Sequence, residues 1–528
     1  MTKKLLLVLP LLGAALLVSL FPPTFAQSNE KKVPEEKAFK EARDTKDPRK
    51  KLEALETFLK DYPYGMRADS VRELILDTVI KNWPAQKDQI KAAAENMIDT
   101  APFWNKTSVY DDVANKLIAA RVMPEFAEEL AAKGLAAEEK EMEETARKTR
   151  ASYLGTLGRA LLNNGKAAEA EKTLKEAYSL DPSSPAVDHG LAEIAEKRGD
   201  LQQALSYEMA AFLTSQSSEE ARPRTKIEEL YRKLHGSLDG LDAALDARYE
   251  KESPNPLAVE RYHSGRSRTN RVVLAELFTG AGCAPCAAAD LAFDGLAERY
   301  SHNDLAVLIY HLHIPRPDPM TNPSAQTRHD FYTPPGTPTY VIDGDAVPGG
   351  GGRDYANTLF NRIVSAIEPE LEKPPEASIV LTARLEANHV VVNANLDRIT
   401  STSKDLRLQI ALVEDKLRYS GENGIRFHNM VVRSLAGDKA GGFVVAAGQP
   451  ASIKQDFDIG AISNELKKSL DGYEVAGHRG EPFTFTEKKY QIDPAMLSVV
   501  AFVQDNTTKN VLQAVYTRVS PAGGPEGK

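Results

Sequence analysis

The chain has 528 residues, which is more than one hydrophobic core usually organises, so the sequence predicts two to four domains. Its composition is that of a soluble globular protein, with 42% hydrophobic and 27% charged residues. A formal net charge of −9 argues against a nucleic-acid-binding protein, because such proteins neutralise phosphates with basic side chains.

The first 26 residues have the organisation of a secretory signal peptide. Lys3 and Lys4 precede an apolar run over residues 5–21, and Thr24 and Ala26 fit the −3 and −1 positions of a cleavage site. We therefore expect cleavage after Ala26 and an exported chain, periplasmic or extracellular, with no membrane span in its mature form. An uncleaved N-terminal anchor is the alternative, because the apolar run is nearly long enough to cross a bilayer.

Residues 27–250 are rich in Ala, Leu, Glu and Lys and predict a helical region. A pattern recurs in it at a distance of 34 residues. The five positions of the first copy and their equivalents in the second are Leu157, Gly158, Gly165, Ala170, Ala177 and Leu191, Ala192, Gly199, Ala204, Ala211. This period, with small residues where paired helices touch, resembles the tetratricopeptide repeat, and the resemblance implies a surface that binds a peptide or another protein. A generic helical bundle is the alternative.

Residues 251–270 carry prolines and charges without periodicity and predict a linker. After it, residues 272–278 have the apolar run of a buried strand, and "GAGCAPC" leads into a helix. A second strand is expected over residues 305–314, a short helix over 324–332, a third strand in "TPTYVIDG" and a closing helix over 353–371. The segment "PGGGGRD" (348–354) lacks the Lys-Ser/Thr of a phosphate-binding loop, so we interpret it as a flexible connection.

Cys283 and Cys286, the only cysteines of the chain, lie at this strand–helix junction. Exported proteins that need disulfides for stability usually have several cysteines, so a single C-x-x-C favours chemistry over cross-linking. A helix N-terminus stabilises a thiolate. We therefore expect Cys283 to be the ionised, reachable nucleophile, and Cys286, one turn on and facing inward, to resolve the mixed disulfide.

The order strand, C-x-x-C, helix, strand, insertion, two strands and helix resembles the thioredoxin superfamily over residues 271–372, and "ELFTGAGCAPC" resembles a signature of exported members. The resemblance implies that Pro338 is a cis-proline facing the dithiol and that the Thr337 backbone pairs with a substrate peptide. It also implies that Glu276 stands near the place of the buried acid that, in this family, accepts a proton from the resolving thiol, here Cys286. The spacing of Glu276 is one residue longer than in the family, so a surface ion pair is the alternative.

His311 and His313 share one face of the second strand, whose end should lie near the active site. Three roles are open: a structural one, tuning of a thiol pKa, or binding of copper or zinc together with the cysteines, for which Met320 would be a soft ligand of Cu(I). No second C-x-x-C completes a structural zinc site, and no cofactor is predicted.

Beyond residue 375 the hydrophobic period changes to two, over residues 379–385, 390–396 and 406–412, and residues 497–517 predict a terminal hairpin. We expect an immunoglobulin-like β-sandwich over residues 375–520 and a tail over 521–528. The predicted fold is therefore multidomain: an all-α tetratricopeptide-like region, an α/β thioredoxin-like domain and an all-β sandwich.

The favoured function is an exported thiol–disulfide oxidoreductase that acts on protein clients or a redox partner through the pair Cys283 and Cys286, with the helical repeats binding the client. A non-enzymatic protein-binding scaffold with a redox-inactive thioredoxin-like domain is one alternative. Copper delivery through the cysteines and a histidine is a second. The direction of the redox reaction depends on a potential that the sequence does not specify.

Overall fold

The computed structural model describes residues 32–138, 146–214, 224–265, 267–437, 441–479 and 482–521. The expected signal peptide over residues 1–26 and nearly all of the expected tail lie outside the described residues. The chain divides into two compact units, Met1–Ala170 and Glu171–Lys528. Within the described ranges, no helix has the length and apolar character that a membrane span requires.

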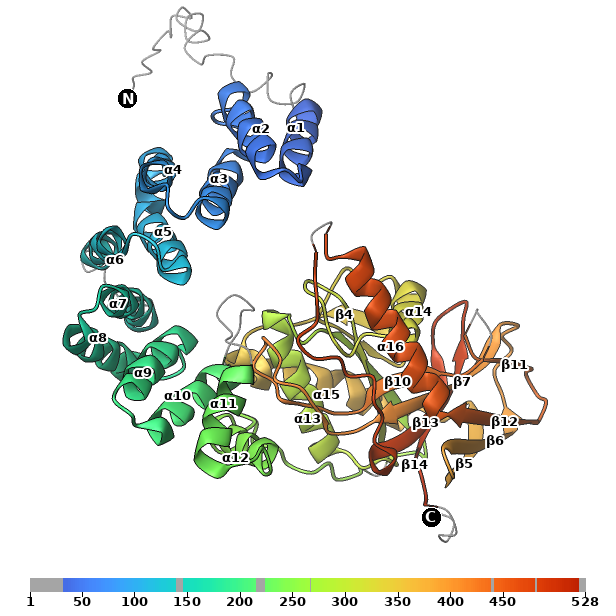
Figure 1. The fold of residues 1–528 in the computed structure, drawn as a ribbon. Coiled ribbons are helices and arrows are strands. Elements are labelled where there is room, and N and C mark those ends of the chain that lie inside the picture. Colours follow the sequence, from blue (N-terminus) through green and yellow to red (C-terminus); the bar gives the residue numbers. More distant parts are fainter. Residues whose placement is uncertain are drawn as a thin grey trace, which may run out of the picture. The chain divides into compact units, whose positions relative to one another are not determined.

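The first unit is helical (Figure 1). Its helices are α1 (Lys32–Asp44), α2 (Pro48–Asp61), α3 (Ala68–Asn82), α4 (Lys87–Thr100), α5 (Lys106–Ala120), α6 (Pro124–Glu138) and α7 (Ala146–Asn163). Each helix packs against the next one along the chain. Buried side chains of α3 to α7 form one apolar core, which stabilises the unit without any disulfide among its described residues.

The two copies of the 34-residue pattern each fall on two consecutive helices. The second unit continues with α8 (Ala167–Leu180), α9 (Pro185–Lys197), α10 (Leu201–Thr214), α11 (Arg224–His235) and α12 (Leu241–Glu252). Gly165, after α7, and Gly199, after α9, both have left-handed φ angles, of 79° and 82°. Glycine takes this conformation without a Cβ penalty and ends a helix. The equivalent alanines Ala170, Ala177, Ala204 and Ala211 are fully buried, as expected for close helix packing.

Fourteen strands follow in the described part of the second unit: β1 (Val273–Thr279), β2 (Leu305–His311), β3 (Thr339–Ile342), β4 (Asp345–Pro348), β5 (Ala377–Glu386), β6 (His389–Ile399), β7 (Leu406–Glu414), β8 (Leu417–Arg418), β9 (Phe427–His428), β10 (Val431–Leu435), β11 (Phe443–Val445), β12 (Ala451–Asp458), β13 (Leu497–Asp505) and β14 (Val511–Arg518). Four helices accompany them: α13 (Ala287–Arg299), α14 (Pro323–Tyr332), α15 (Ala356–Glu372) and α16 (Ile459–Ala476). The short helix and the terminal hairpin expected from the sequence are confirmed as α14 and as β13 with β14.

The largest sheet has nine strands, in the order β14-β13-β7-β10-β2-β1-β3-β4, with β11 paired to β7. Strand β1 is parallel to β2 and antiparallel to β3, and β3 is antiparallel to β4. Every residue of β1 and β2 is buried, and side chains of α13, α14 and α15 belong to the same core. Continuous apolar strands of this kind are typical of a sheet covered on both faces.

The expected separate sandwich over residues 375–520 differs from the structure. Two sheets do face each other there, since buried residues of β6 share a core with those of β7 and β13. However, only β5, β6 and β12 form the smaller sheet, whereas β7, β10, β13 and β14 extend the sheet that contains β1 and β2. Strand β10 pairs with β2 at Val431 and Ile309. The unpaired edge of β2 would expose backbone groups, and β10 satisfies them.

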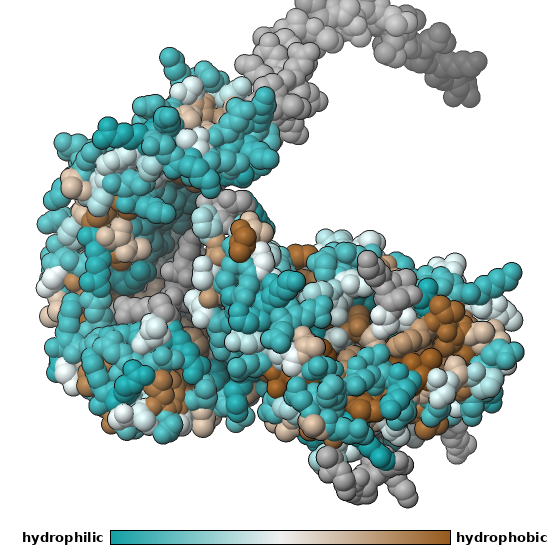
Figure 2. Space-filling view, turned by 45° about the vertical axis from the view of Figure 1, so that its right-hand side comes forward, coloured by the Kyte–Doolittle hydropathy of each residue, from teal (hydrophilic) through white to brown (hydrophobic). Residues whose placement is uncertain are grey.

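Hydrophilic residues cover most of the surface visible in Figure 2, and the larger hydrophobic areas lie on the part that carries the sheets. The exposed valines Val380, Val444 and Val475 belong to this part.

Candidate active site at the cysteine pair

The cysteine pair lies where β1 ends and α13 begins. The chain turns through Gly280, whose Cβ, if present, would lie 2.7 Å from the carbonyl oxygen of Ile314, so a side chain does not fit there. Cys283 then precedes a short 3-10 helix, η2 (Ala284–Cys286), that runs directly into α13. Cys283 therefore caps the 3-10 helix, and Cys286 directly precedes α13.

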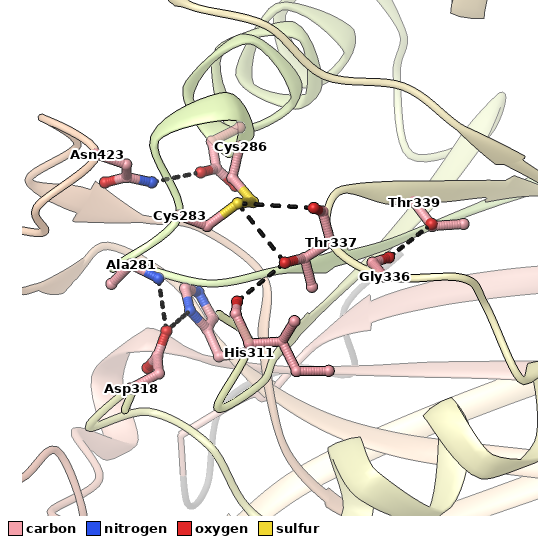
Figure 3. Close-up of a disulfide and its surroundings, with 11 residues drawn as sticks. Ala281, Cys283, Cys286, His311, Asp318, Gly336, Thr337, Thr339 and Asn423 are labelled. Atoms are coloured by element: carbon pink, nitrogen blue, oxygen red, sulfur yellow. Dashed lines mark hydrogen bonds and ion pairs between the residues drawn. A yellow bond between two sulfur atoms is a disulfide. The ribbon is translucent and has the colours of Figure 1, made fainter. Parts of the chain in front are cut away.

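Cys283 and Cys286 form a disulfide, with a Cα–Cα distance of 5.3 Å (Figure 3). The Thr337–Pro338 peptide bond is cis, as the resemblance implied. The structure brings this segment to the disulfide: the carbonyl oxygen of Thr337 lies 3.8 Å from Cys283 Sγ, and its hydroxyl oxygen lies 3.6 Å from the same sulfur. The same hydroxyl is 2.9 Å from the carbonyl oxygen of Ile314. Three of the predicted site residues therefore meet here: Cys283, Thr337 and Cys286.

Neither cysteine is reachable in this structure, because both side chains have an exposed fraction of 0%. This corrects the expectation that Cys283 is accessible. One reason for this burial is the glycine-rich segment 348–354, which we interpreted from the sequence as a flexible connection. The backbone N–H of Gly351 donates to the carbonyl of Pro285 at 2.8 Å, and the N–H of Ala288 donates to the carbonyl of Gly351 at 3.1 Å. Residues 349–352 are therefore fixed against the cysteine turn, and we call them the glycine strap.

A second segment packs on the other residues of the turn. The backbone N–H of Asn423 donates to the carbonyl of Ala281 at 2.9 Å. Next to it, Glu422 forms an ion pair with Arg316, and a Cβ at Gly282 would lie only 2.8 Å from Arg316 Cβ. Asn423 belongs to the loop between β8 and β9, so the C-terminal part of the unit completes the surroundings of the dithiol.

The structure places Glu276 away from the role expected for it. Its carboxylate accepts hydrogen bonds from Arg328 at 2.7 and 2.9 Å, from Tyr332 at 2.7 Å and from Tyr310 at 3.0 Å. The described hydrogen-bond partners of this carboxylate include neither cysteine, and the ion pair with Arg328 is buried rather than on the surface. A buried carboxylate needs an opposite charge, and Arg328 on α14 supplies it.

The two histidines have different surroundings. His311 Nδ1 lies 2.9 Å from Asp318 Oδ2, and its Nε2 has no hydrogen-bond partner among the described residues. Burial alone would raise the pKa of Asp318, but His311 and two backbone N–H groups outweigh it and lower that pKa. His313 stacks on Tyr473 and accepts the N–H of Asp318, and burial lowers its pKa to about 4.

The arrangement offers no evident metal centre. In the part of the chain that the structure describes, no group of three or more His, Cys, Asp or Glu side chains could hold a metal ion. Met320, the soft ligand considered above, is buried in an apolar cluster with Ala281, Leu417 and Val431.

Two carboxylates near the pair were missed in the sequence. Asp290 lies four residues after Cys286 on α13, and Asp294 lies four residues further on. Asn423 donates to Asp290 Oδ2 at 2.8 Å, and Asn429 donates to Asp294 Oδ1 at 2.7 Å. The spacing of four residues, which places side chains on one face of a helix, was the signal that could have identified them.

No protein-family model and no curated protein matches this chain. Solved structures similar to it include MamA MSR-1 C2, with 20% identity and a TM-score of 0.23 over 34% of this chain and 92% of that chain. PilW, a type IV pilus biogenesis factor, has 15% identity and a TM-score of 0.25 over 41% and 98% of the two chains. The pilF protein of Pseudomonas aeruginosa has 13% identity and a TM-score of 0.25 over 43% and 92%. All three are tetratricopeptide-like helical repeat proteins.

Proposed function

We propose that this protein is an exported, thioredoxin-like thiol–disulfide oxidoreductase that exchanges disulfides with protein clients through Cys283 and Cys286. The observation that carries the proposal is the position of the disulfide. It lies in the turn between β1 and α13, and Cys283 Sγ is 3.8 Å from the carbonyl oxygen of Thr337. A disulfide at a helix N-terminus favours attack that releases a thiolate, because the helix dipole stabilises the negative charge.

The strand order supports a thioredoxin-like core. Strands β2, β1, β3 and β4 are adjacent in that order, with β1 and β2 parallel and β3 reversed. The dithiol lies at the carboxyl end of β1, where open α/β sheets usually carry their functional groups. The helical repeats would bind the client or a redox partner, and the N-terminal signal of residues 1–26 would export the chain.

Trapping of mixed disulfides tests the proposal. Cys286→Ala removes the resolving thiol, so a client attacked by Cys283 should stay covalently bound. We expect disulfide-linked adducts on non-reducing gels that disappear on reduction. Cys283→Ala is the matched control and should trap few or none. Equal trapping by the two variants, or none by either, would reject the proposal.

A non-enzymatic, protein-binding scaffold is a second candidate, and the zero exposure of both cysteines favours it. In that case the disulfide would only stabilise the turn between β1 and α13, and the helical repeats would carry the function. The double variant Cys283→Ser/Cys286→Ser separates the two candidates in a deletion strain. Full restoration of the wild-type phenotype by this variant supports the scaffold, and loss of the phenotype supports disulfide exchange.

A further inference from the structure

Proton supply at the cysteine pair poses a problem that the proposed function leaves open. Breaking the disulfide leaves a thiolate on Cys286, which is fully buried. An unpaired buried charge is costly, so this thiolate needs a proton. Glu276 is held by Arg328 in a separate network and is not placed to supply it.

Helix α13 carries a line of ionisable side chains that starts at the disulfide. Cys286, Asp290, Asp294 and Glu298 follow one another at intervals of four residues. Side chains four residues apart on a helix lie above one another, about 6 Å apart. Asp290 is buried, Asp294 is partly buried and Glu298 is exposed, so the line runs from the buried disulfide to the surface.

The buried end of this line has one hydrogen-bonded and two charged or ionisable neighbours. Asn423 donates to Asp290 Oδ2, and His311 and Asp318 act on Asp290 electrostatically. Burial raises the pKa of Asp290 to about 7, although the nearby His311 and the Asn423 hydrogen bond lower it. Asp290 therefore changes its protonation near neutral pH.

The outer end opens into a cavity of about 440 Å³ that Asp294, Glu298, Glu250, Asp415, Lys416 and His302 line. Burial raises the pKa of Asp294 to about 7, the hydrogen bond from Asn429 opposes this, and the charges of Asp290, Asp415 and Glu298 raise it further. Two carboxyl groups one turn apart thus titrate in the same range, and the outer one borders a cavity that reaches the surface.

We propose that Asp290 and Asp294 form a proton path along one face of α13, from Cys286 to the cavity at Glu298. The inference rests on the proposed function and names residues that the resemblance did not supply. Both carboxyl groups are held by amides of the C-terminal part, Asn423 and Asn429, so this extension serves the dithiol directly.

A thiolate of a client dithiol attacks Cys283 Sγ, a new S–S bond forms, and the Cys283–Cys286 bond breaks with its electron pair going to Cys286. The protonated carboxyl of Asp290 gives its proton to the Cys286 thiolate, and Asp294 returns a proton to Asp290 from the cavity. The second client thiolate then attacks the client sulfur of the mixed disulfide, the bond to Cys283 breaks with its electron pair going to Cys283, and the Cys283 thiolate takes up a proton from solvent. The client is thus oxidised to a disulfide and the protein is reduced to a dithiol. The two protons lost by the client thiols equal the two that the protein gains.

Reduction of the full-length protein by dithiothreitol, measured from pH 5 to pH 9 and normalised to the thiolate concentration, tests the path. In the wild-type protein the normalised rate should fall as the pH rises through about 7, because only the protonated carboxyl donates. Asp290→Asn should slow reduction at pH 6 by at least about tenfold and remove this fall. Asp294→Asn should slow it less, and the double variant should match Asp290→Asn, since the two residues act in series.

Two further variants separate a proton path from a structural role. Asn423→Ala keeps the carboxyl but removes a hydrogen bond that lowers the pKa of Asp290, so the midpoint of the pH profile should shift upward. Asp345→Asn removes an exposed carboxylate of β4 and should leave the profile unchanged. Unchanged profiles in Asp290→Asn and Asn423→Ala would overturn the proton path. If the pH profiles of these variants change but Cys286→Ala traps no client, the proton path is retained and the proposed function is rejected.

Discussion

The glycine strap shows how single residues control access to the disulfide. A Cβ added at Gly350 would lie 2.5 Å from the carbonyl oxygen of Pro285 and would also overlap Pro338. Pro285 lies between the two cysteines in the sequence, and Pro338 follows Thr337, which contacts Cys283 Sγ. By contrast, a Cβ at Gly352 would meet no atom within 4 Å. The strap can therefore contact the cysteine turn only because position 350 lacks a side chain.

We predict that Gly350→Ala loosens the strap, whereas Gly352→Ala does not. The free energy of unfolding should fall by about 1–3 kcal/mol in the first variant, as for other overpacked sites, and change little in the second. The disulfide should also be reduced faster by dithiothreitol in Gly350→Ala. Urea unfolding and reduction rates measure the two effects, and identical behaviour of the two alanine variants would contradict the packing argument.

The candidate site was predictable from the sequence where the signal was local. The positions of Cys283 and Cys286 at a strand–helix junction follow from a short apolar run and a helical pattern. The burial of both cysteines did not follow, because the residues that enclose them, Gly351 and Asn423, come from segments distant in sequence. The partner of Glu276 was missed for the same reason, since Arg328 lies 52 positions further along the chain.

At the scale of elements, α9 contains a fully buried acid, Asp188. Asp188 has an exposed fraction of 0%, and neither of its carboxylate oxygens has a hydrogen-bond partner among the described residues. Burial raises its pKa from 3.8 to about 8, although Arg248 lowers it. The folded chain thus holds a proton on Asp188 over a pH range in which the unfolded chain has lost it.

Asp188 makes the free energy of unfolding depend on pH, and the sign of this dependence follows from its raised pKa. The contribution of Asp188 is fully present below about pH 4 and is lost as the pH rises toward 8, by about 1.4 kcal/mol per pH unit at most. We predict that Asp188→Asn gains stability relative to the wild-type protein between pH 5 and pH 8, as measured by urea unfolding. Asp345→Asn is the control and should keep the wild-type pH dependence. If the free energies of unfolding of Asp188→Asn and the wild-type protein differed by the same amount at pH 5 and at pH 8, Asp188 would not be protonated in the folded chain.

The fold was predictable element by element but not in its connections. The 34-residue period indicated the consecutive helices on which its two copies fall, and alternation of hydrophobic residues indicated β5, β6 and β7. Alternation specifies that a strand has one buried face, but not which strand lies beside it. The pairing of β10 with β2 joins residues more than 100 positions apart, and no local pattern reports such a contact.

At the scale of the whole molecule, one nine-stranded sheet of the second unit includes strands from both of the domains that the sequence suggested. Arg271, before β1, donates to the carbonyls of Val511 and Leu512 on β14, and its guanidinium pairs with Asp343. Arg328 on α14 also donates to Gln504 on β13. The charged groups of the expected thioredoxin-like part are therefore satisfied by the C-terminal strands, and separating the two parts would leave several buried donors without partners.

We predict that the second unit opens as one cooperative element. Hydrogen exchange of the full-length protein, followed at increasing urea concentrations, should give free energies of opening for β1 and β2 that agree with those for β7 and β13 within about 1 kcal/mol, because breaking the β2–β10 edge exposes both cores. Helices α3 to α5, which have a core of their own in the first unit, serve as the internal comparison and should open with a different free energy. If β7 and β13 opened well below β1 and β2, the C-terminal strands would be an independent domain, and the amides of Asn423 and Asn429 could leave the dithiol without unfolding it.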